Sequence, residues 1–119
     1  MSKDYKFGLD TFGDVTVDDK GNLQSAAQTI RNLVEQAKLA DELGVYGINV
    51  GEHHRPDFAV SAPDSVLAGI ATVTKNIMLG TGVTVLSSDD PVRVFQRFST
   101  VDALSNGRAE ITAGRGSFI

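Results

Sequence analysis

The chain contains no cysteine, no long apolar run and no excess of positive charge. Without cysteine, neither a disulfide bond nor a thiolate metal site can form. No apolar run approaches the roughly 18 residues of a membrane-spanning helix, and the first residues lack the apolar core of a signal peptide. We therefore expect a cytoplasmic protein that does not enter a membrane.

Acidic residues outnumber basic residues by 15 to 11, which gives a net charge of −4. A nucleic-acid partner is excluded on this balance, because no basic stripe is available to neutralise phosphates. With 41% hydrophobic and 22% charged residues, the composition is typical of a soluble globular protein. At 119 residues the chain can bury one core but has no room for a second domain.

Apolar residues recur at helical spacing in three segments. The first helix is expected over residues 23–40, with Asn22 or Ser25 as its cap and Gly44 beyond its end. The other two begin at Pro63 and Pro91, where a missing N–H costs nothing. The side chains expected to face inward are Leu23, Ala26, Ala27, Ile30, Leu33, Val34, Ala37 and Ala40, then Val66, Leu67, Ile70 and Val73, then Val94, Phe95, Phe98, Val101 and Leu104.

Four strands alternate with these helices, at residues 7–12, 45–51, 77–86 and 109–113. Such alternation predicts a parallel sheet. A doubly wound sheet would carry a glycine-rich phosphate loop after its first strand, and residues 11–14 do not form one. A (β/α)₈ barrel instead places functional residues just past the strand ends. The unusual residues of this chain stand there, so the barrel is the favoured α/β architecture.

Four strands make only half of such a barrel, which typically needs about 250 residues. Residues 1–119 are therefore expected to form the N-terminal half of a single barrel domain, with the remainder of the barrel needed for function. Left as an open sheet, the chain would expose the edges of its first and fourth strands together with an apolar inner face.

The adjacent histidines His53 and His54 raise the question of a metal site. Neighbouring side chains on extended backbone point to opposite sides, and no third histidine or cysteine exists to complete a zinc site. No metal is therefore expected. For one histidine, a general acid–base role and a simple hydrogen bond to Glu52 or Asp57 remain equally open. Arg55 is as well suited to a loop carboxylate as to a ligand.

Two glycine-containing segments follow the third and fourth strands. Gly82 stands where a buried strand would favour a β-branched residue, so it indicates either a tight bend or backbone lying beneath a flat ligand. Arg115 lies between Gly114 and Gly116 and before Ser117. This arrangement suits an anion or a carbonyl-rich ring edge, and equally a surface turn. The spacing of a P-loop is absent.

Three stretches together resemble the bacterial-luciferase-like flavin-dependent monooxygenases, in that family's order and spacing. They are residues 50–56 (VGEHHRP), residues 79–93 (LGTGVTVL running into PVR) and residues 104–116 (LSNGRAE and GRG). The resemblance implies a (β/α)₈ barrel that binds reduced FMN, or alternatively F420. In FMN members, reduced flavin and O₂ oxidise a small organic substrate.

The resemblance also assigns residues. It implies that His53 is the active-site histidine, with Glu52 and His54 as flanking cofactor-binding positions. It places a non-prolyl cis peptide at Gly82-Val83, beneath the flavin ring, and a flavin contact at Arg115. A flavin reductase would supply the reduced cofactor, and the complete protein would be a homodimer joined through the helices that begin at Pro63 and Pro91. Two alternatives are an F420-dependent oxidoreductase and a non-catalytic flavoprotein-like subunit.

Overall fold

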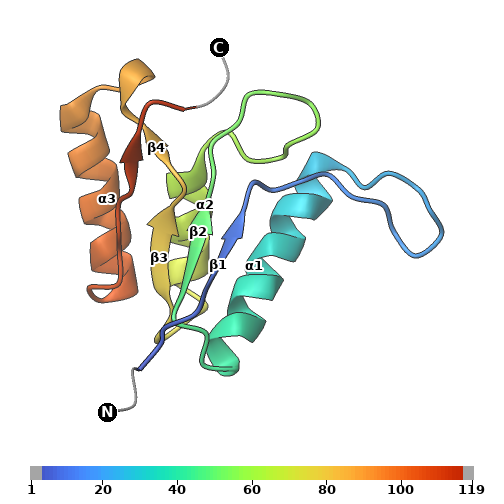
Figure 1. The fold of residues 1–119 in the computed structure, drawn as a ribbon, viewed down its shortest axis with the longest axis horizontal. Helices are drawn as coiled ribbons and strands as arrows, with labels where there is room; N and C mark the ends of the chain where they lie inside the picture. The colour runs from blue at the N-terminus through green and yellow to red at the C-terminus, as the bar shows by residue number, and fades with distance from the viewer. Residues whose placement is uncertain (1–3, 117–119) are drawn as a thin grey trace.

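The computed structural model describes residues 4–116, which form a parallel sheet and three long helices (Figure 1). Each helix begins where the sequence supplies a cap or a proline: the Ser25 hydroxyl accepts a hydrogen bond from the Gln28 amide, and Asp90 accepts two amides at the start of the last helix. The elements in chain order are β1 (Gly8–Thr11), α1 (Ala26–Glu42), β2 (Gly47–Val50), α2 (Pro63–Ala71), β3 (Met78–Thr81), β4 (Thr84–Val85), the 3₁₀ helix η1 (Leu86–Ser88), α3 (Pro91–Ser105) and β5 (Ala113–Gly114).

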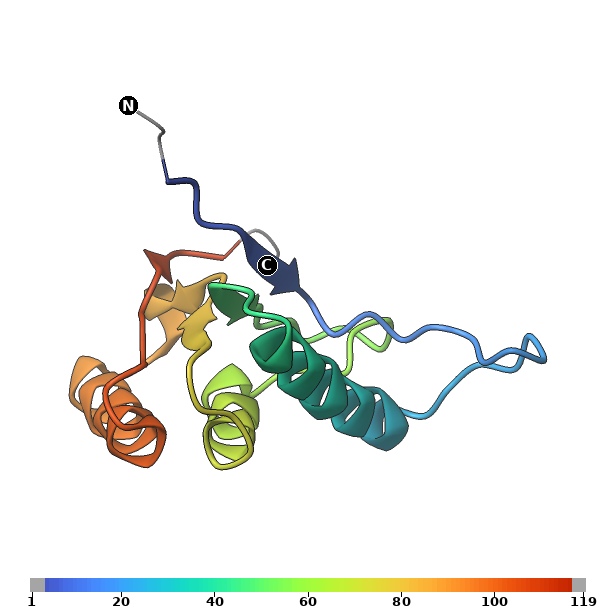
Figure 2. The same cartoon turned by 90° about the horizontal axis from the view of Figure 1, so that it is seen from below.

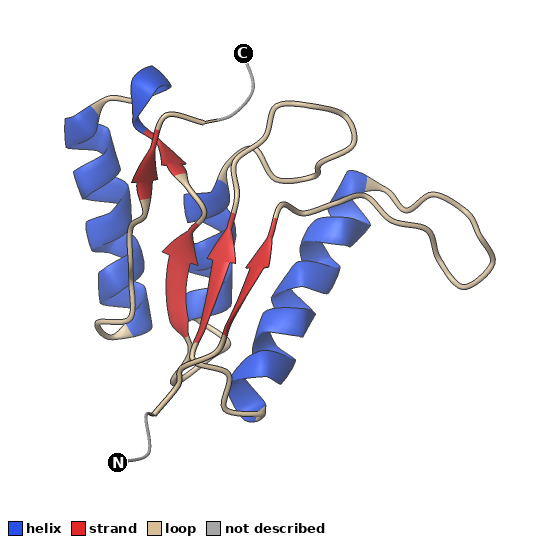
Figure 3. Ribbon diagram, viewed as in Figure 1, coloured by secondary structure: helices blue, strands red, loops and turns tan. Residues whose placement is uncertain are grey.

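The strands run parallel in the order β1-β2-β3, and their arrows point the same way in Figure 3. The register places Asp10 beside Asn49, and Asn49 beside Gly80. A parallel bridge from Leu79 to Ala109 joins the fourth segment to β3, and β5 continues that segment alongside β4. Sequential parallel neighbours are the arrangement of consecutive units in a (β/α)₈ barrel wall.

All three helices cover one face of the sheet, as Figure 2 shows. The core lies between these two layers and includes Ile48, Val50 and Leu79 from the strands with Leu67 and Phe98 from the helices. A doubly wound sheet would carry helices on both faces. The one-sided cover therefore supports the choice of barrel-type architecture over the doubly wound alternative.

The third predicted strand, residues 77–86, is interrupted in the structure. β3 ends at Thr81, β4 begins at Thr84, and the peptide bond between Gly82 and Val83 is cis. The fourth predicted strand, residues 109–113, is reduced to the bridge at Ala109 and the two residues of β5. Both changes occur near the carboxyl ends of the strands, where backbone is diverted to form a cavity wall.

Several side chains expected to face inward are exposed. On α3, Phe95 is 71% and Leu104 is 47% exposed. Helices α1 and α3 lie at the two ends of the helix row (Figure 2), so each has a flank that no other described element covers. Periodicity locates the apolar side of a helix but not the number of neighbours it has. The other exposed members of the predicted set are Leu23, Ala26, Ala27 and Val73.

The sheet face opposite the helices is more polar than predicted. Asp10 and Asn49 lie on it side by side, and the Asn49 amide donates to Asp10 Oδ1 at 2.8 Å. The Tyr46 hydroxyl, just before β2, donates to Glu110 Oε1 at 3.3 Å on the fourth segment, beyond β3. The expectation of an apolar inner face was therefore wrong for this part of the sheet.

Within residues 4–116, none of the helices has both the length and the apolar character that crossing a membrane would require.

Candidate active site

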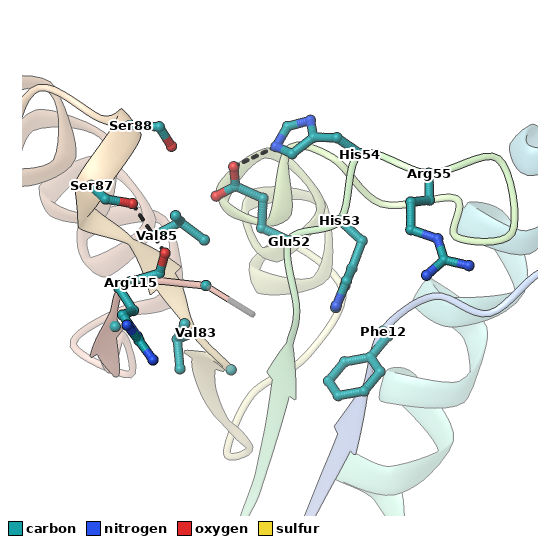
Figure 4. Close-up of a pocket in the computed structure, with 13 residues that line it drawn as sticks. Phe12, Glu52, His53, His54, Arg55, Val83, Val85, Ser87, Ser88 and Arg115 are labelled. Carbon is teal, nitrogen blue, oxygen red and sulfur yellow. Dashed lines mark hydrogen bonds and ion pairs between the residues drawn. The ribbon is translucent and has the colours of Figure 1, made fainter. Parts of the chain in front are cut away.

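A cavity of about 850 Å³ opens at the carboxyl ends of the parallel strands. All six residues assigned from the sequence line it, although they come from three separate segments of the chain. Figure 4 shows its two sides, one formed by the segments after β2 and the other by the segments around β4 and β5. The complete lining is Phe12, Glu52, His53, His54, Arg55, Gly82, Val83, Val85, Ser87, Ser88, Gly114, Arg115 and Gly116.

Gly51 allows close packing where β1 and β2 meet the cavity. Its amide donates to the Thr11 carbonyl at 2.8 Å, which extends the pairing of β1 and β2 by one residue. A Cβ at this position would lie 2.7 Å from Phe12 Cδ1 and 3.1 Å from the Gly82 carbonyl oxygen. Only glycine therefore allows the Phe12 ring and the Gly82 backbone to approach the end of β2 so closely.

Glu52 and His54 form a hydrogen bond at the cavity, with 2.7 Å between Glu52 Oε1 and His54 Nε2 (Figure 4). The Glu52 side chain is 16% exposed, whereas the His54 side chain is 69% exposed. His54 therefore lies on the solvent side of the pair, and Glu52 lies at the cavity wall.

His53 contacts two aromatic rings. Its ring centroid is 4.7 Å from that of Phe12 and 4.4 Å from that of Phe58. Its backbone amide donates to the Val60 carbonyl at 3.0 Å, which closes the loop that carries it. Among residues 4–116, no group of three or more histidine, cysteine or acidic side chains could hold a metal ion.

The Gly82–Val83 segment forms the floor between the two sides. The cis peptide expected there is present. The Thr81 and Thr84 hydroxyls bracket the segment and hydrogen-bond to each other at 2.7 Å, both buried. Val83 packs against Gly114, where a Cβ would come within 2.6 Å of Val83 Cγ2. Gly114 thus makes room for Val83, a packing reason that the sequence pattern alone did not indicate.

Arg115 follows β5 and is exposed at the cavity. Its carbonyl accepts a hydrogen bond from the Ser87 hydroxyl at 3.0 Å (Figure 4), so η1 fixes the backbone from which the guanidinium extends. Gly116 has a positive φ of 79°, a conformation that glycine adopts readily. Ser117, part of the same sequence pattern, lies outside the described residues.

Arg55 pairs with Asp57 through two hydrogen bonds of 3.1 and 2.9 Å. Of the two interpretations open from the sequence, the structure shows the pairing with a loop carboxylate. Four lining residues were missed by sequence reasoning: Phe12, Val85, Ser87 and Ser88. Phe12 stands directly after β1, so its place past a strand end was a signal available in the sequence.

Arg97 connects α3 to two segments that lie near the cavity. From α3 it contacts Asp64 at 2.6 Å, near the start of α2, and also Asp89, next to η1. The hydrogen bond with Asp89 raises the pKa of Arg97 above its ordinary value. The charged network links the start of α2 to the segment that presents Ser87 and Ser88 to the cavity.

The family model described as luciferase-like monooxygenase matches residues 11–118. The chain belongs to this family. The oxygenase component of flavin-dependent trigonelline monooxygenase from Acinetobacter baylyi is 34% identical over 97 residues, which cover 80% of this chain and 27% of that protein. N-acetyl-S-alkylcysteine monooxygenase from Bacillus subtilis is 33% identical over 96 residues, which cover 80% and 29%. This luciferase-like chain thus spans less than a third of these curated relatives.

Solved structures show the same fold. The crystal structure of apo-MsnO8 superposes with a TM-score of 0.83 and 33% identity, covering 92% of this chain and 32% of that one. Two structures at 23% identity share the fold alone. One is the oxygenating constituent of 3,6-diketocamphane monooxygenase from Pseudomonas putida with FMN (TM-score 0.82; 95% and 30% covered). The other is F420-dependent tetrahydromethanopterin reductase from Methanopyrus kandleri (TM-score 0.71; 94% and 27% covered).

Proposed function

We propose that this luciferase-like chain forms the first half of a (β/α)₈ barrel which, when complete, uses reduced FMN and O₂ to oxidise a small organic substrate. The observation that carries the proposal is the convergence of Glu52, His53, His54, Gly82, Val83 and Arg115 on one cavity. The flavin-dependent relative at 34% identity supports the choice of chemistry.

Two features of the cavity, its volume and its floor, support a flavin as the proposed cofactor. Its volume of about 850 Å³ lies within the roughly 300–1,000 Å³ typical of cofactor sites. At Gly82 a Cβ would meet only Asn49 Cβ, at 3.5 Å, so glycine leaves the backbone at the floor bare toward a flat ring. We assign the ring's lower face to Gly82 and Val83, and a polar edge of the cofactor to Arg115.

When bound, reduced FMN would supply the electrons that activate O₂. The chain's own residues would do the rest. We assign to His53 the holding and transfer of a proton at its imidazole, because histidine is the side chain that most often serves as a general acid or base. Glu52 would orient His54 through their 2.7 Å pair. Phe12 would exclude water on the β1 side of the cavity.

The proposal includes three properties of the complete protein. A separate reductase would supply reduced flavin, as the name "oxygenase component" of the Acinetobacter relative indicates for that enzyme. The complete protein would act in the cytoplasm. It would form a homodimer through α2 and α3, and the exposed Val92 and Phe95 of α3 are apolar side chains suited to such an interface.

An F420-dependent oxidoreductase is the second candidate. The fold is shared with an F420-dependent reductase as well as with an FMN complex, so the architecture does not choose between the cofactors. The residues of this cavity are compatible with either tricyclic ring system.

The test uses the complete protein, supplied anaerobically with reduced FMN or with reduced F420 and then exposed to ¹⁸O₂. Trigonelline and an N-acetyl-S-alkylcysteine serve as substrate probes, because the relatives' names contain them. The expected result is one ¹⁸O atom in a product, by mass spectrometry, with reduced FMN only. Hydride transfer from reduced F420 without O₂ uptake would favour the second candidate, and tight binding of neither cofactor would refute both.

A further inference from the structure

The most closely packed aromatic group beside the cavity is made of Phe12, His53 and Phe58. The imidazole of His53 is tilted by 54° against the Phe12 ring and by only 33° against the Phe58 ring, at 4.4 Å between centroids. The two phenylalanine rings contact each other edge to face, with centroids 6.1 Å apart and an interplanar angle of 83°. Each of the three rings therefore contacts the other two. We call this group the His53 clamp.

The clamp joins two chain segments. Phe12 directly follows β1, whereas His53 and Phe58 lie in the loop after β2. Gly51 lets them meet, because a Cβ there would lie 2.7 Å from the Phe12 ring and 3.2 Å from His53 Cε1. Phe12 and His53 thus occupy the space that a side chain at position 51 would fill.

Backbone hydrogen bonds hold the two segments together around the rings. The Ala59 amide donates to the Gly13 carbonyl at 2.7 Å, and the Val15 amide donates to the Asp57 carbonyl at 3.0 Å. An antiparallel bridge pairs Asp14 with Phe58 itself. The backbone of Phe58 is consequently fixed on both sides, which holds its Cα and Cβ close to His53 and leaves only the side-chain rotamer to place the ring.

Arg55 contacts the clamp at the Phe58 ring. Its guanidinium carbon lies 5.8 Å from the centroid of the Phe58 ring, and the same side chain makes two hydrogen bonds to Asp57. An arginine above an aromatic face is attracted by the ring quadrupole. Arg55, whose side chain is half exposed, therefore adds a second neighbour to the Phe58 ring besides His53.

From these contacts we propose that Phe58, with Phe12, is a positioning residue that fixes the plane of the His53 imidazole at the cavity. The proposal rests on the proposed function, in which His53 handles a proton. Proton transfer requires a donor within hydrogen-bond reach and well aligned, and a misplacement of about 1 Å can cost roughly 100-fold in rate. Aromatic rings fix the plane of an imidazole without using either ring nitrogen.

The first test observes the clamp itself, with no need for turnover. Histidine carrying ¹³C in its ring is incorporated into the complete protein, and His53→Gln identifies the His53 resonance by its disappearance. In the wild type, the stacked Phe58 ring should shift His53 ring protons upfield. Phe58→Ala and Phe58→Leu should both move them downfield, and Phe58→Tyr should leave them in place. Phe58→Leu keeps apolar volume, so it reports on the ring even if Phe58→Ala folds poorly.

The second test measures turnover in the same variants. Phe58→Leu should lower kcat by about 10- to 100-fold with little change in KM, and Phe58→Tyr should retain wild-type kcat. Phe7→Leu is the matched control, because Phe7 is an exposed phenylalanine just before β1, at the end of that strand away from the cavity; it should change neither the resonance nor kcat.

Unchanged His53 resonances in Phe58→Leu, or an equal loss of kcat in Phe7→Leu, would overturn the proposal. A wild-type protein without oxygenase activity would instead refute the proposed function, and the resonance shift would still decide whether the clamp exists.

Discussion

The two ends of the parallel strands are built in opposite ways. At the carboxyl ends, glycines and loops leave a cavity of about 850 Å³ lined by charged and aromatic side chains. At the amino ends, Arg108 is only 8% exposed, and its guanidinium donates to groups within the protein. Its five hydrogen bonds, of 2.7–3.1 Å, reach the Ser105, Ile77, Ala71 and Thr74 carbonyls and the Thr74 hydroxyl.

A second polar side chain completes the closed end. Asp41, near the end of α1, accepts the backbone amides of Lys75, Asn76 and Ile77 at 2.9, 2.8 and 2.7 Å. Together Arg108 and Asp41 satisfy backbone groups at the ends of α2 and α3 and just before β3. One end of the sheet thus uses its polar groups to hold the fold, whereas the other end keeps them available at a cavity, as barrel enzymes separate stability from catalysis.

The largest expected effect is on catalysis and comes from the open end. His53→Ala in the complete protein should lower kcat by about 10²- to 10⁴-fold, the usual contribution of a general acid–base. The thermal unfolding midpoint should stay within a few degrees of wild type, because His53 is not part of the core between the sheet and the helices and its substitution leaves that core intact. Unchanged turnover would remove His53 from the catalytic assignment.

The converse experiment removes the arginine at the closed end. Arg108→Met keeps an apolar stem but leaves four backbone carbonyls without their donor, and a buried acceptor without a partner destabilises the folded state. We expect a total loss of about 3–5 kcal/mol in unfolding free energy, with kcat per folded molecule unchanged. Arg93→Met, an exposed arginine of α3, is the control. A fall in kcat without loss of stability would contradict the comparison.

A glycine that packs at the cavity should tolerate a new Cβ less well than a glycine on an open helix surface. Gly114→Ala introduces a Cβ within 2.6 Å of Val83, and such overpacking typically costs about 1–3 kcal/mol. Because Val83 lines the cavity, flavin affinity should fall together with stability. In Gly69→Ala, a control within α2, the new Cβ meets nothing within 4 Å, so stability should rise by about 0.5–1 kcal/mol. Titration calorimetry and thermal unfolding measure both quantities, and equal effects of the two substitutions would contradict this reasoning.

The sequence predicted the open end well because its signals are local. Strand alternation, the Glu52-His53-His54 run and the glycines at 82 and 114 placed every assigned residue on one cavity, and the resemblance anticipated the cis peptide. The partners of those residues depend on contacts between distant segments. The packing of Phe58 on His53, for example, follows from a bridge to Asp14 that no periodicity indicates.

The closed end was not anticipated at all. Arg108 and Asp41 are single charged residues in amphipathic surroundings, which on sequence alone indicate solvent-exposed positions. The exposed Phe95 and Leu104 of α3 were misjudged for the opposite reason. Helical spacing shows which residues share a face, but the burial of that face depends on which neighbours the fold provides.

The smallest effect, and the most specific, concerns the pH dependence of the closed end. Burial alone would raise the pKa of Asp41, but the amides of Lys75, Asn76 and Ile77 and the charge of Arg108 outweigh it, so the pKa is lowered. A carboxyl with a lowered pKa in the folded protein stabilises fully above its unfolded pKa of about 3.9, and this contribution is lost as the pH falls through the folded value.

Asp41→Asn should therefore cost about 1 kcal/mol at pH 7, comparable to the loss of a helix cap, and the difference from wild type should shrink below about pH 4. Asp19→Asn, in an exposed turn, is the matched control and should stay within about 0.5 kcal/mol of wild type. Urea unfolding between pH 3 and 7 measures both differences. A difference that grows as the pH falls would show that the amide cluster does not favour the Asp41 carboxylate.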